Sequence, residues 1–371
     1  MVAVQGLAWV LVGLFCVGCI SNRLDGPIHD AKGPPYIADG AGSDVAPIEI
    51  VHRVLLIGDA GLYLEDDPTL AALGRVAAEA PASTVLYLGD NVYNNGLQDD
   101  DRERGEKILG QQLEATSARK IVVPGNHDWG MIPSKRTAQS IRNEQAFVDG
   151  WKDGKAEFLP KDGCMGPVAR RLEPARGFRK GVVAVLLDPT PWFTPALREI
   201  CPRGETEESH LAALEKILAT HQDDWVVVAS HYPMLTGGPH GGLTYGFFAD
   251  MIVGTLGWWM GGLGNTDAPA YADWIAKVGE VMREHPPAVY AAGHDHSLQV
   301  LDGGGTVGLH VVSGAGAPDR VSTVTNIAET RFAHAHAGFV VLDFGRRGRL
   351  ESAVLRVYEN GRDAPVFEMD L

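Results

Sequence analysis

Side chains that can bind metal ions follow apolar, strand-length runs at five places in the chain. The five clusters are G-D-A-G at 58–61, G-D-N-V-Y at 89–93, G-N-H-D at 125–128, S-H-Y-P at 230–233 and G-H-D-H at 293–296. Open α/β sheets bind ligands beyond the carboxyl ends of their strands, so we expect the clusters to meet at one edge. A single Asp or His at such a place is usually a turn residue, but five clusters of one kind favour a common site.

The candidate ligands in these clusters are all oxygen or nitrogen donors, and none is a Cys. This composition argues against a thiolate zinc site or an iron–sulfur cluster. Seven ligands exceed what one metal needs, whereas two metals would each receive four if Asp90 bridges them. Two cations held about 3.5–4 Å apart can clamp the attacking and leaving oxygens of a displacement at phosphorus. The seven candidates are Asp59, Asp90, Tyr93, Asn126, His231, His294 and His296.

Four glycines directly precede candidate ligands, at positions 58, 89, 125 and 293. Without a Cβ, each would let the chain turn sharply and approach a metal closely. This repetition is difficult to explain by folding alone.

The elements around the clusters alternate between strand-like and helix-like patterns, which indicates βαβ units and a layered sheet. Residues 150–179 have no clear pattern and are expected to form loops. The chain after residue 298 is β-rich. Strands are expected at 52–57, 84–88, 120–123, 181–187, 225–229, 288–292, 298–301, 307–312, 338–344 and 352–358. Helices are expected at 68–80, 101–117, 134–148, 205–219 and 268–284.

The composition is that of a globular protein: 371 residues, of which 45% are hydrophobic. This length suits one large domain or two ordinary ones. The formal net charge of −15 argues against non-specific binding to nucleic acid or to anionic lipid. It does not exclude a local cationic site, because bound metals dominate their own surroundings.

The N-terminus predicts an exported protein. Residues 2–18 are apolar apart from Gln5, as in export signals. Gly18-Cys19 resembles the lipobox of bacterial lipoproteins, which implies lipidation of Cys19 and membrane attachment by a lipid anchor. Cys16 stands where that motif usually has Leu, and no Lys or Arg precedes the apolar run. A plain signal peptide or an uncleaved anchor are the alternatives.

The remainder of the chain divides into a flexible linker at 20–48 and a catalytic domain at 49–371. Cys164 and Cys201 could pair in an exported protein or remain two free thiols. A Gly-rich insert at 237–266 carries several aromatic residues, including Tyr245, Trp258 and Trp259. It could pack on the domain as a loop, cover the site as a lid, or contact a membrane.

The order of the five clusters resembles the calcineurin-like metallophosphoesterase superfamily, and within it the purple acid phosphatases, over about residues 50 to 345. The resemblance implies an α/β fold, a β-sandwich flanked by helices in four layers (α/β/β/α), with a dinuclear site at the carboxyl edge. Most of the superfamily has a His where this chain has Gly61. Purple acid phosphatases also lack it and use a Tyr three residues after the bridging Asp, the place of Tyr93.

The same resemblance divides the ligands between two metals. It implies Fe(III) bound by Asp59, Asp90, Tyr93 and His296. It implies Fe, Zn or Mn bound by Asp90, Asn126, His231 and His294. Free Tyr ionises only near pH 10, so a phenolate ligand favours a trivalent ion beside Tyr93.

Two further histidines are expected to act on the substrate. His127 would orient ligands or contact the phosphate, with Asp128 as a partner. His240 lies nine residues after His231 and resembles the residue that protonates the leaving group in small, animal-type purple acid phosphatases.

These observations predict a lipid-anchored metallophosphatase of the cell envelope or surface, or otherwise a periplasmic or secreted one, that hydrolyses small phosphate monoesters. A phosphodiesterase or nucleotide hydrolase on the same site is one alternative. A non-catalytic surface-binding lipoprotein is another, although its ligand set would normally have eroded. The sequence does not decide the natural substrate, the second metal or the oligomeric state.

Overall fold

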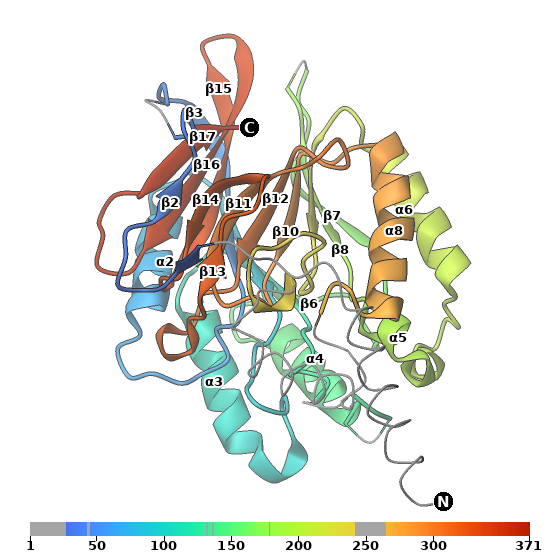
Figure 1. The fold of residues 1–371 in the computed structure, drawn as a ribbon. Helices are drawn as coiled ribbons and strands as arrows, with labels where there is room; N and C mark the ends of the chain where they lie inside the picture. The colour runs from blue at the N-terminus through green and yellow to red at the C-terminus, as the bar shows by residue number, and fades with distance from the viewer. Residues whose placement is uncertain (1–26, 43–44, 131–132, 136, 178, 242–264) are drawn as a thin grey trace, which may run out of the picture.

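The computed structural model describes residues 27–42, 45–130, 133–135, 137–177, 179–241 and 265–371. In this part of the chain two β-sheets pack face to face, and helices cover the outer face of each sheet (Figure 1). The predicted four-layer α/β/β/α sandwich is therefore confirmed. The expected signal segment and Cys19 lie outside the described residues, as do residues 242–264 of the insert.

The first sheet has seven strands, and its central strands are parallel. Its C-terminal strands add to β3 in antiparallel pairs. Its order is β17 (Phe367–Asp370), β16 (Leu350–Glu359), β15 (Gly338–Arg347), β3 (Glu49–Ile57), β4 (Ser83–Leu88), β5 (Arg119–Val123) and β6 (Ala156–Phe158).

The second sheet has eight strands, with a parallel centre and antiparallel strands on both sides. Its order is β2 (Tyr36–Ile37), β14 (Thr330–His334), β11 (Leu298–Asp302), β12 (Leu309–Ser313), β10 (Val289–Ala292), β9 (Trp225–Ala229), β8 (Val182–Leu186) and β7 (Val168–Glu173).

The helices fall into two groups, one for each sheet. The first sheet is covered by α2 (Pro68–Ala78), α3 (Arg102–Glu114) and α4 (Gln139–Asp149). The second is covered by α5 (Thr190–Phe193), α6 (Glu207–Thr220) and α8 (Pro269–Glu284), which lie together at the right of Figure 1. Short 3-10 turns are η2 (Asp99–Asp101), η3 (Pro195–Ile200), η4 (Pro239–Gly241) and η5 (Pro318–Arg320). No helix among these described residues has the length and hydropathy to cross a membrane.

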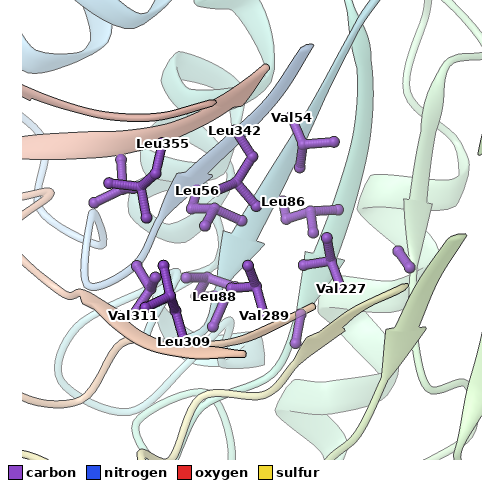
Figure 2. Packing of buried hydrophobic residues seen from close by; sticks show 14 of the residues in the cluster. Val54, Leu56, Leu86, Leu88, Val227, Val289, Leu309, Val311, Leu342 and Leu355 are labelled. Carbon is purple, nitrogen blue, oxygen red and sulfur yellow. The ribbon is translucent and has the colours of Figure 1, made fainter. Parts of the chain in front are cut away.

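The central strands are buried on both faces, which explains their continuous apolar runs. In β3, Val54 and Leu56 point into the space between the sheets, while Leu55 and Ile57 pack against the helices. This division follows from the two-residue period of a strand. Figure 2 shows side chains of the two sheets meeting across this central layer, with Leu86 and Leu88 of β4 opposite Val227 and Val289.

Two regions differ from the sequence prediction. The expected linker at 20–48 contains β1 (Ile28–His29), which pairs with β13 (Val324–Thr325), and β2, which pairs with β14. The imidazole of His334 also lies 3.1 Å from the carbonyl of Gly33. Residues 27–42 are thus attached to the domain, because β2 extends the second sheet beside β14 and β1 forms a separate two-stranded sheet with β13.

The expected loop at 150–179 contains β6 and β7. The short β6 has only three residues, and β7 carries two arginines in place of an apolar run, so neither gave a strand pattern. Cys164, between these strands, forms a disulfide with Cys201. This settles a pairing that the sequence left open.

Candidate metal centre

The predicted ligands lie at the carboxyl ends of strands from both sheets. Asp59 follows β3, Asp90 follows β4 and Asn126 follows β5, all in the first sheet. His231 follows β9, and His294 and His296 follow β10, in the second sheet. Backbone hydrogen bonds tie these turns together: the amide of residue 59 donates to the carbonyl of residue 89 at 2.9 Å, and that of residue 58 to residue 313 at 2.7 Å.

Asp59, Asp90 and His231 form the centre of this group. Their ligand atoms all lie within 4.8 Å of one another, and all three residues are buried. Carboxylates are almost never buried unless they are paired or bind a metal. These three groups could therefore hold a metal ion.

His231 presents a lone pair to the centre. Its Nδ1 lies 2.8 Å from the Leu88 carbonyl and must donate to it, so Nε2 is the free ring nitrogen. That Nε2 lies 3.0 Å from Oδ1 of Asn126, which is also an acceptor, and 3.1 Å from Nδ1 of His294. Either a proton on Nε2 of His231 or a bound cation satisfies these acceptors. Burial lowers the pKa of His231, but the Asp90 and Asp59 carboxylates raise it more.

A second contact group surrounds the phenol of Tyr93. The hydroxyl lies 2.9 Å from Oδ1 of Asp59 and 3.2 Å from Nε2 of His296. Nδ1 of His296 donates to the Arg320 carbonyl at 2.7 Å, which again leaves Nε2 facing the centre. Burial, followed by the Asp59 and Asp90 charges, raises the pKa of Tyr93 well above its ordinary value. Tyr93 could therefore ligate as a phenolate only beside a strongly polarising cation.

Three of the five described non-glycine residues with positive φ are predicted ligands. Asp59, Asp90 and His294 have φ values of 59°, 54° and 69°, in the left-handed region that non-glycine residues rarely adopt. Such conformations cost about 1–3 kcal/mol each and cluster at functional sites. The sequence assigned the sharp turns to the preceding glycines, but for these residues the ligand itself takes the left-handed conformation.

The glycines serve mainly to allow close approach. A Cβ at Gly125 would lie 2.3 Å from Oδ1 of Asp90, and one at Gly293 would lie 2.6 Å from Oδ2 of Asp59. Gly89 combines both needs, because its φ is 91° and a Cβ there would meet the His231 ring at 2.7 Å. These positions thus show close approach to predicted ligands, whereas close approach to a metal stays a prediction.

His127 and Asp128 do not form the expected pair. His127 hydrogen-bonds the Asn94 carbonyl through Nδ1 at 2.7 Å, and its Nε2 lies 3.9 Å from Asp90. Asp128 instead accepts the amides of Asn91 at 2.8 Å and Gly125 at 2.7 Å. It joins the turns that carry Asp90 and Asn126, since a fully buried carboxylate takes the backbone donors nearest to it.

His240 lies against the centre, on η4. Its ring stacks on that of His294, with centroids 3.9 Å apart and an interplanar angle of 28°. Its backbone amide donates to Asp295 at 3.1 Å. Its Nδ1 is buried and has no hydrogen-bond partner within the described residues. A proton donor or acceptor is thus available beside the predicted ligands.

The sequence did not identify two residues at this site. Asp295, between two predicted ligands, is fully buried and accepts hydrogen bonds from Thr236 and from the amide of His240. It therefore fixes the loop that carries His240. Arg320 stacks on the Tyr93 ring. The Gly-rich turn after β12 indicates a close approach of the backbone there, but it does not predict a role for the arginine that follows.

Comparison with known proteins identifies a family and relatives of this chain. A family model described as "Calcineurin-like phosphoesterase" matches residues 52–298. Tartrate-resistant acid phosphatase type 5 of Homo sapiens is 25% identical over 299 residues, which cover 76% of this chain and 76% of the human protein. The same protein of Oryctolagus cuniculus is 25% identical over 253 residues, which cover 66% of this chain but only 64% of the rabbit protein's length.

A solved structure shares the fold. It is titled "GAP50 the anchor in the inner membrane complex of Plasmodium" and superposes with a TM-score of 0.58 over 87% of this chain and 89% of that chain. The sequence identity is 13%, so this likeness concerns the fold alone.

Proposed function

This chain belongs to the calcineurin-like phosphoesterase family and is purple acid phosphatase-like, and we propose that it hydrolyses phosphate monoesters with two metal ions bound at the candidate metal centre. The family and the acid phosphatase relatives support phosphoester hydrolysis in general. The observation that carries the proposal is the meeting of buried oxygen and nitrogen donors from both sheets at one point.

The contacts support a division of the ligands into two sets. Tyr93 and His296 lie together beside Asp59, and we assign these three with Asp90 to an Fe(III) ion. Asn126 and His294 lie together beside His231, and we assign these three with Asp90 to a second ion, Fe, Zn or Mn. Asp90 would bridge, because it belongs to the central group and lies 3.4 Å from Nε2 of His231.

When bound, the two cations supply Lewis acidity for the phosphoryl oxygens and for the attacking water. The chain's own part is to fix the ligands. The carbonyls of Leu88 and Arg320 hold His231 and His296 in the tautomer whose Nε2 faces inward. The amide of His127 donates to Oδ1 of Asp90 at 2.8 Å and holds that carboxylate in place.

Proton transfer to the leaving oxygen falls to His240. Its ring is held by stacking on His294 and by the anchored backbone amide, so it can point into the site without losing position. His127 lies on the Tyr93 side of the centre and could contact the phosphoryl group there. General acid catalysis of this kind contributes about 10²–10⁴-fold in rate.

The test measures metal content and hydrolysis together. Purified protein supplied with iron and with zinc or manganese should bind close to two metals per chain and should hydrolyse aryl phosphate monoesters faster than diesters. Asp90→Ala should lose both metals and activity, whereas the control Asp223→Asn, an exposed carboxylate outside the centre, should lose neither.

The outcomes separate the alternatives. Preferential diester or nucleotide hydrolysis would favour the phosphodiesterase or nucleotide hydrolase. Two bound metals without turnover of any phosphoester would favour a surface-binding protein. Unchanged metal content in Asp90→Ala would refute the proposed centre.

We also propose that the protein is exported and anchored by a lipid on Cys19. The apolar segment at 2–18 and its Gly18-Cys19 end support this. So does the Cys164–Cys201 disulfide, since such bonds persist mainly in oxidising compartments. Cys19→Ser should abolish incorporation of labelled fatty acid and move the protein from the membrane fraction to the soluble one.

A further inference from the structure

Arg320 lies beside the candidate metal centre without being a predicted ligand. It ends η5, and its guanidinium carbon lies 3.8 Å from the centroid of the Tyr93 ring. The hydroxyl at the tip of that ring points to Asp59 and His296. Arg320 thus covers one face of the Tyr93 ring, whose hydroxyl contacts predicted ligands, and its positive charge lies beside the candidate metal centre.

The Arg320 guanidinium has no carboxylate partner among the described residues. Most arginines of the described ranges form ion pairs with Asp or Glu. Of those that do not, Arg320 alone is half-buried, and the others are exposed: Arg142, Arg283, Arg349 and Arg362. A cation that is partly removed from water without a counter-charge is unfavourable.

The hydrogen-bonding capacity of Arg320 is also largely unused. Nη1 lies 3.5 Å from Oδ1 of Asn94, at the limit of a hydrogen bond, and the buried Nε has no partner within the described residues. The neighbouring Arg104 is different, because it already binds the Tyr93 carbonyl and Asp101. Arg320 is therefore the cation with donors left for a ligand.

We propose that Arg320 is a specificity-determining residue that binds a second anionic group of the substrate, one carried by the leaving group. The inference rests on the proposed function, in which the phosphoryl group lies at the metal centre. Arg320 lies over the ring face and 3.5 Å from Asn94, not among the predicted ligand atoms. We therefore assign it to what is attached to the phosphoryl group. A guanidinium binds phosphate and carboxylate in a two-pronged manner. The substrate class is therefore phosphorylated compounds whose leaving group is itself an anion.

The test compares phenyl phosphate with 4-carboxyphenyl phosphate and pyrophosphate, on the wild type, Arg320→Gln and Arg320→Lys. Arg320→Gln should lower kcat/KM for the two substrates with a charged leaving group about 10- to 100-fold, mainly through KM, since hydrogen bonds to charged groups have that strength. Phenyl phosphate should change less than about threefold. Arg320→Lys should retain part of the preference for substrates with a charged leaving group, because Lys keeps the positive charge but lacks the two-pronged hydrogen bonding of Arg. The control is Arg349→Gln, an exposed arginine without an ion-pair partner in the described chain, which should leave kcat/KM unchanged for all three substrates.

Equal losses on all three substrates would overturn the proposal, because Arg320 would then act on the phosphoryl group or on Tyr93. No loss on any of them would overturn it too.

Calorimetry of pyrophosphate and of inorganic phosphate on the metal-loaded protein gives a second readout: Arg320→Gln should weaken binding of pyrophosphate only. This measurement distinguishes failure of the proposed function from failure of the proposed role of Arg320. If the wild type hydrolyses no phosphoester, the proposed function fails, but selective loss of pyrophosphate binding still supports the role of Arg320. Equal binding by wild type and Arg320→Gln refutes it. Should Arg320→Gln fail to fold, an unchanged preference in Arg320→Lys is the refuting result.

Discussion

The pH dependence of stability gives a prediction that can be worked out from one histidine. His310, on β12, is 5% exposed, and burial lowers its pKa to about 4 from an ordinary value of 6.5. Its Nδ1 is buried without a hydrogen-bond partner among the described residues, and its nearest ring is that of Tyr290, 5.7 Å away. The folded protein therefore holds this imidazole neutral.

The sign of the effect follows from this difference. Below pH 6.5 the unfolded chain takes up a proton on His310, whereas the folded chain does so only near pH 4. The free energy of unfolding is thus fully retained above pH 6.5, falls as the pH drops, and stops falling on this account below pH 4. A difference of two and a half pKa units is worth about 3 kcal/mol. Burial also lowers the pKa of His52 and of His210 to about 4, so the three together should give a steep acid loss of stability.

His310→Phe isolates one of these contributions. At pH 7 to 8 the variant should differ from the wild type by a constant amount, which serves as the internal control. Relative to that constant difference, it should gain about 2.5 kcal/mol on the wild type by pH 4.5, measured by urea unfolding of both proteins with the same metal content. A difference that stays flat between pH 7 and 4.5 would show that His310 is not kept neutral by burial, and the reasoning would be wrong.

Three further outcomes are expected. Tyr93→Phe removes the phenol that reaches Asp59, and should abolish any visible absorption of the iron-loaded protein while leaving zinc binding at the other ligands. Replacing Cys164 and Cys201 together by Ser should lower the free energy of unfolding by about 2–4 kcal/mol at neutral pH, because the bridge closes a loop of 37 residues. Gly125→Ala should reduce the bound metal below two per chain, since the new Cβ would stand 2.3 Å from the Asp90 carboxylate.

Each of these has a result that would contradict it. Absorption retained in Tyr93→Phe would remove the phenol from the ligand set. Equal unfolding midpoints with and without the disulfide would mean that the connected loops are already fixed by packing. Gly33→Ala is the control for Gly125→Ala, because a Cβ there has no contact nearer than 3.8 Å and should leave the metal content unchanged.

The central strands and the clusters after them could be predicted because their signals are local. The runs that became β3, β4 and β9 are apolar on both faces, and each ends at a turn with an Asp or His. The weaker elements were missed for a physical reason. β2 and β6 have two and three residues, and only pairing with a distant strand stabilises them.

The residues that support the site were harder to predict than the residues expected to bind metal. Asp128 was expected to face His127, but backbone amides from two turns compete for it and win because they are close and fixed. The role of Arg320 depends on a stacking contact between parts of the chain 227 residues apart, from 93 to 320. No periodicity records such a contact, so it could be found only in three dimensions.

The donor atoms come from two separate sheets, which has a consequence for distant mutations. Asp59 and Asp90 move with one layer, and His231 and His294 with the other. The thickness of the hydrophobic layer between the two sheets therefore sets the distance between the predicted ligands of one sheet and those of the other. Enlarging or shrinking a side chain in that layer, such as Leu86, is therefore expected to change the distance between the two groups of predicted ligands without altering any of them.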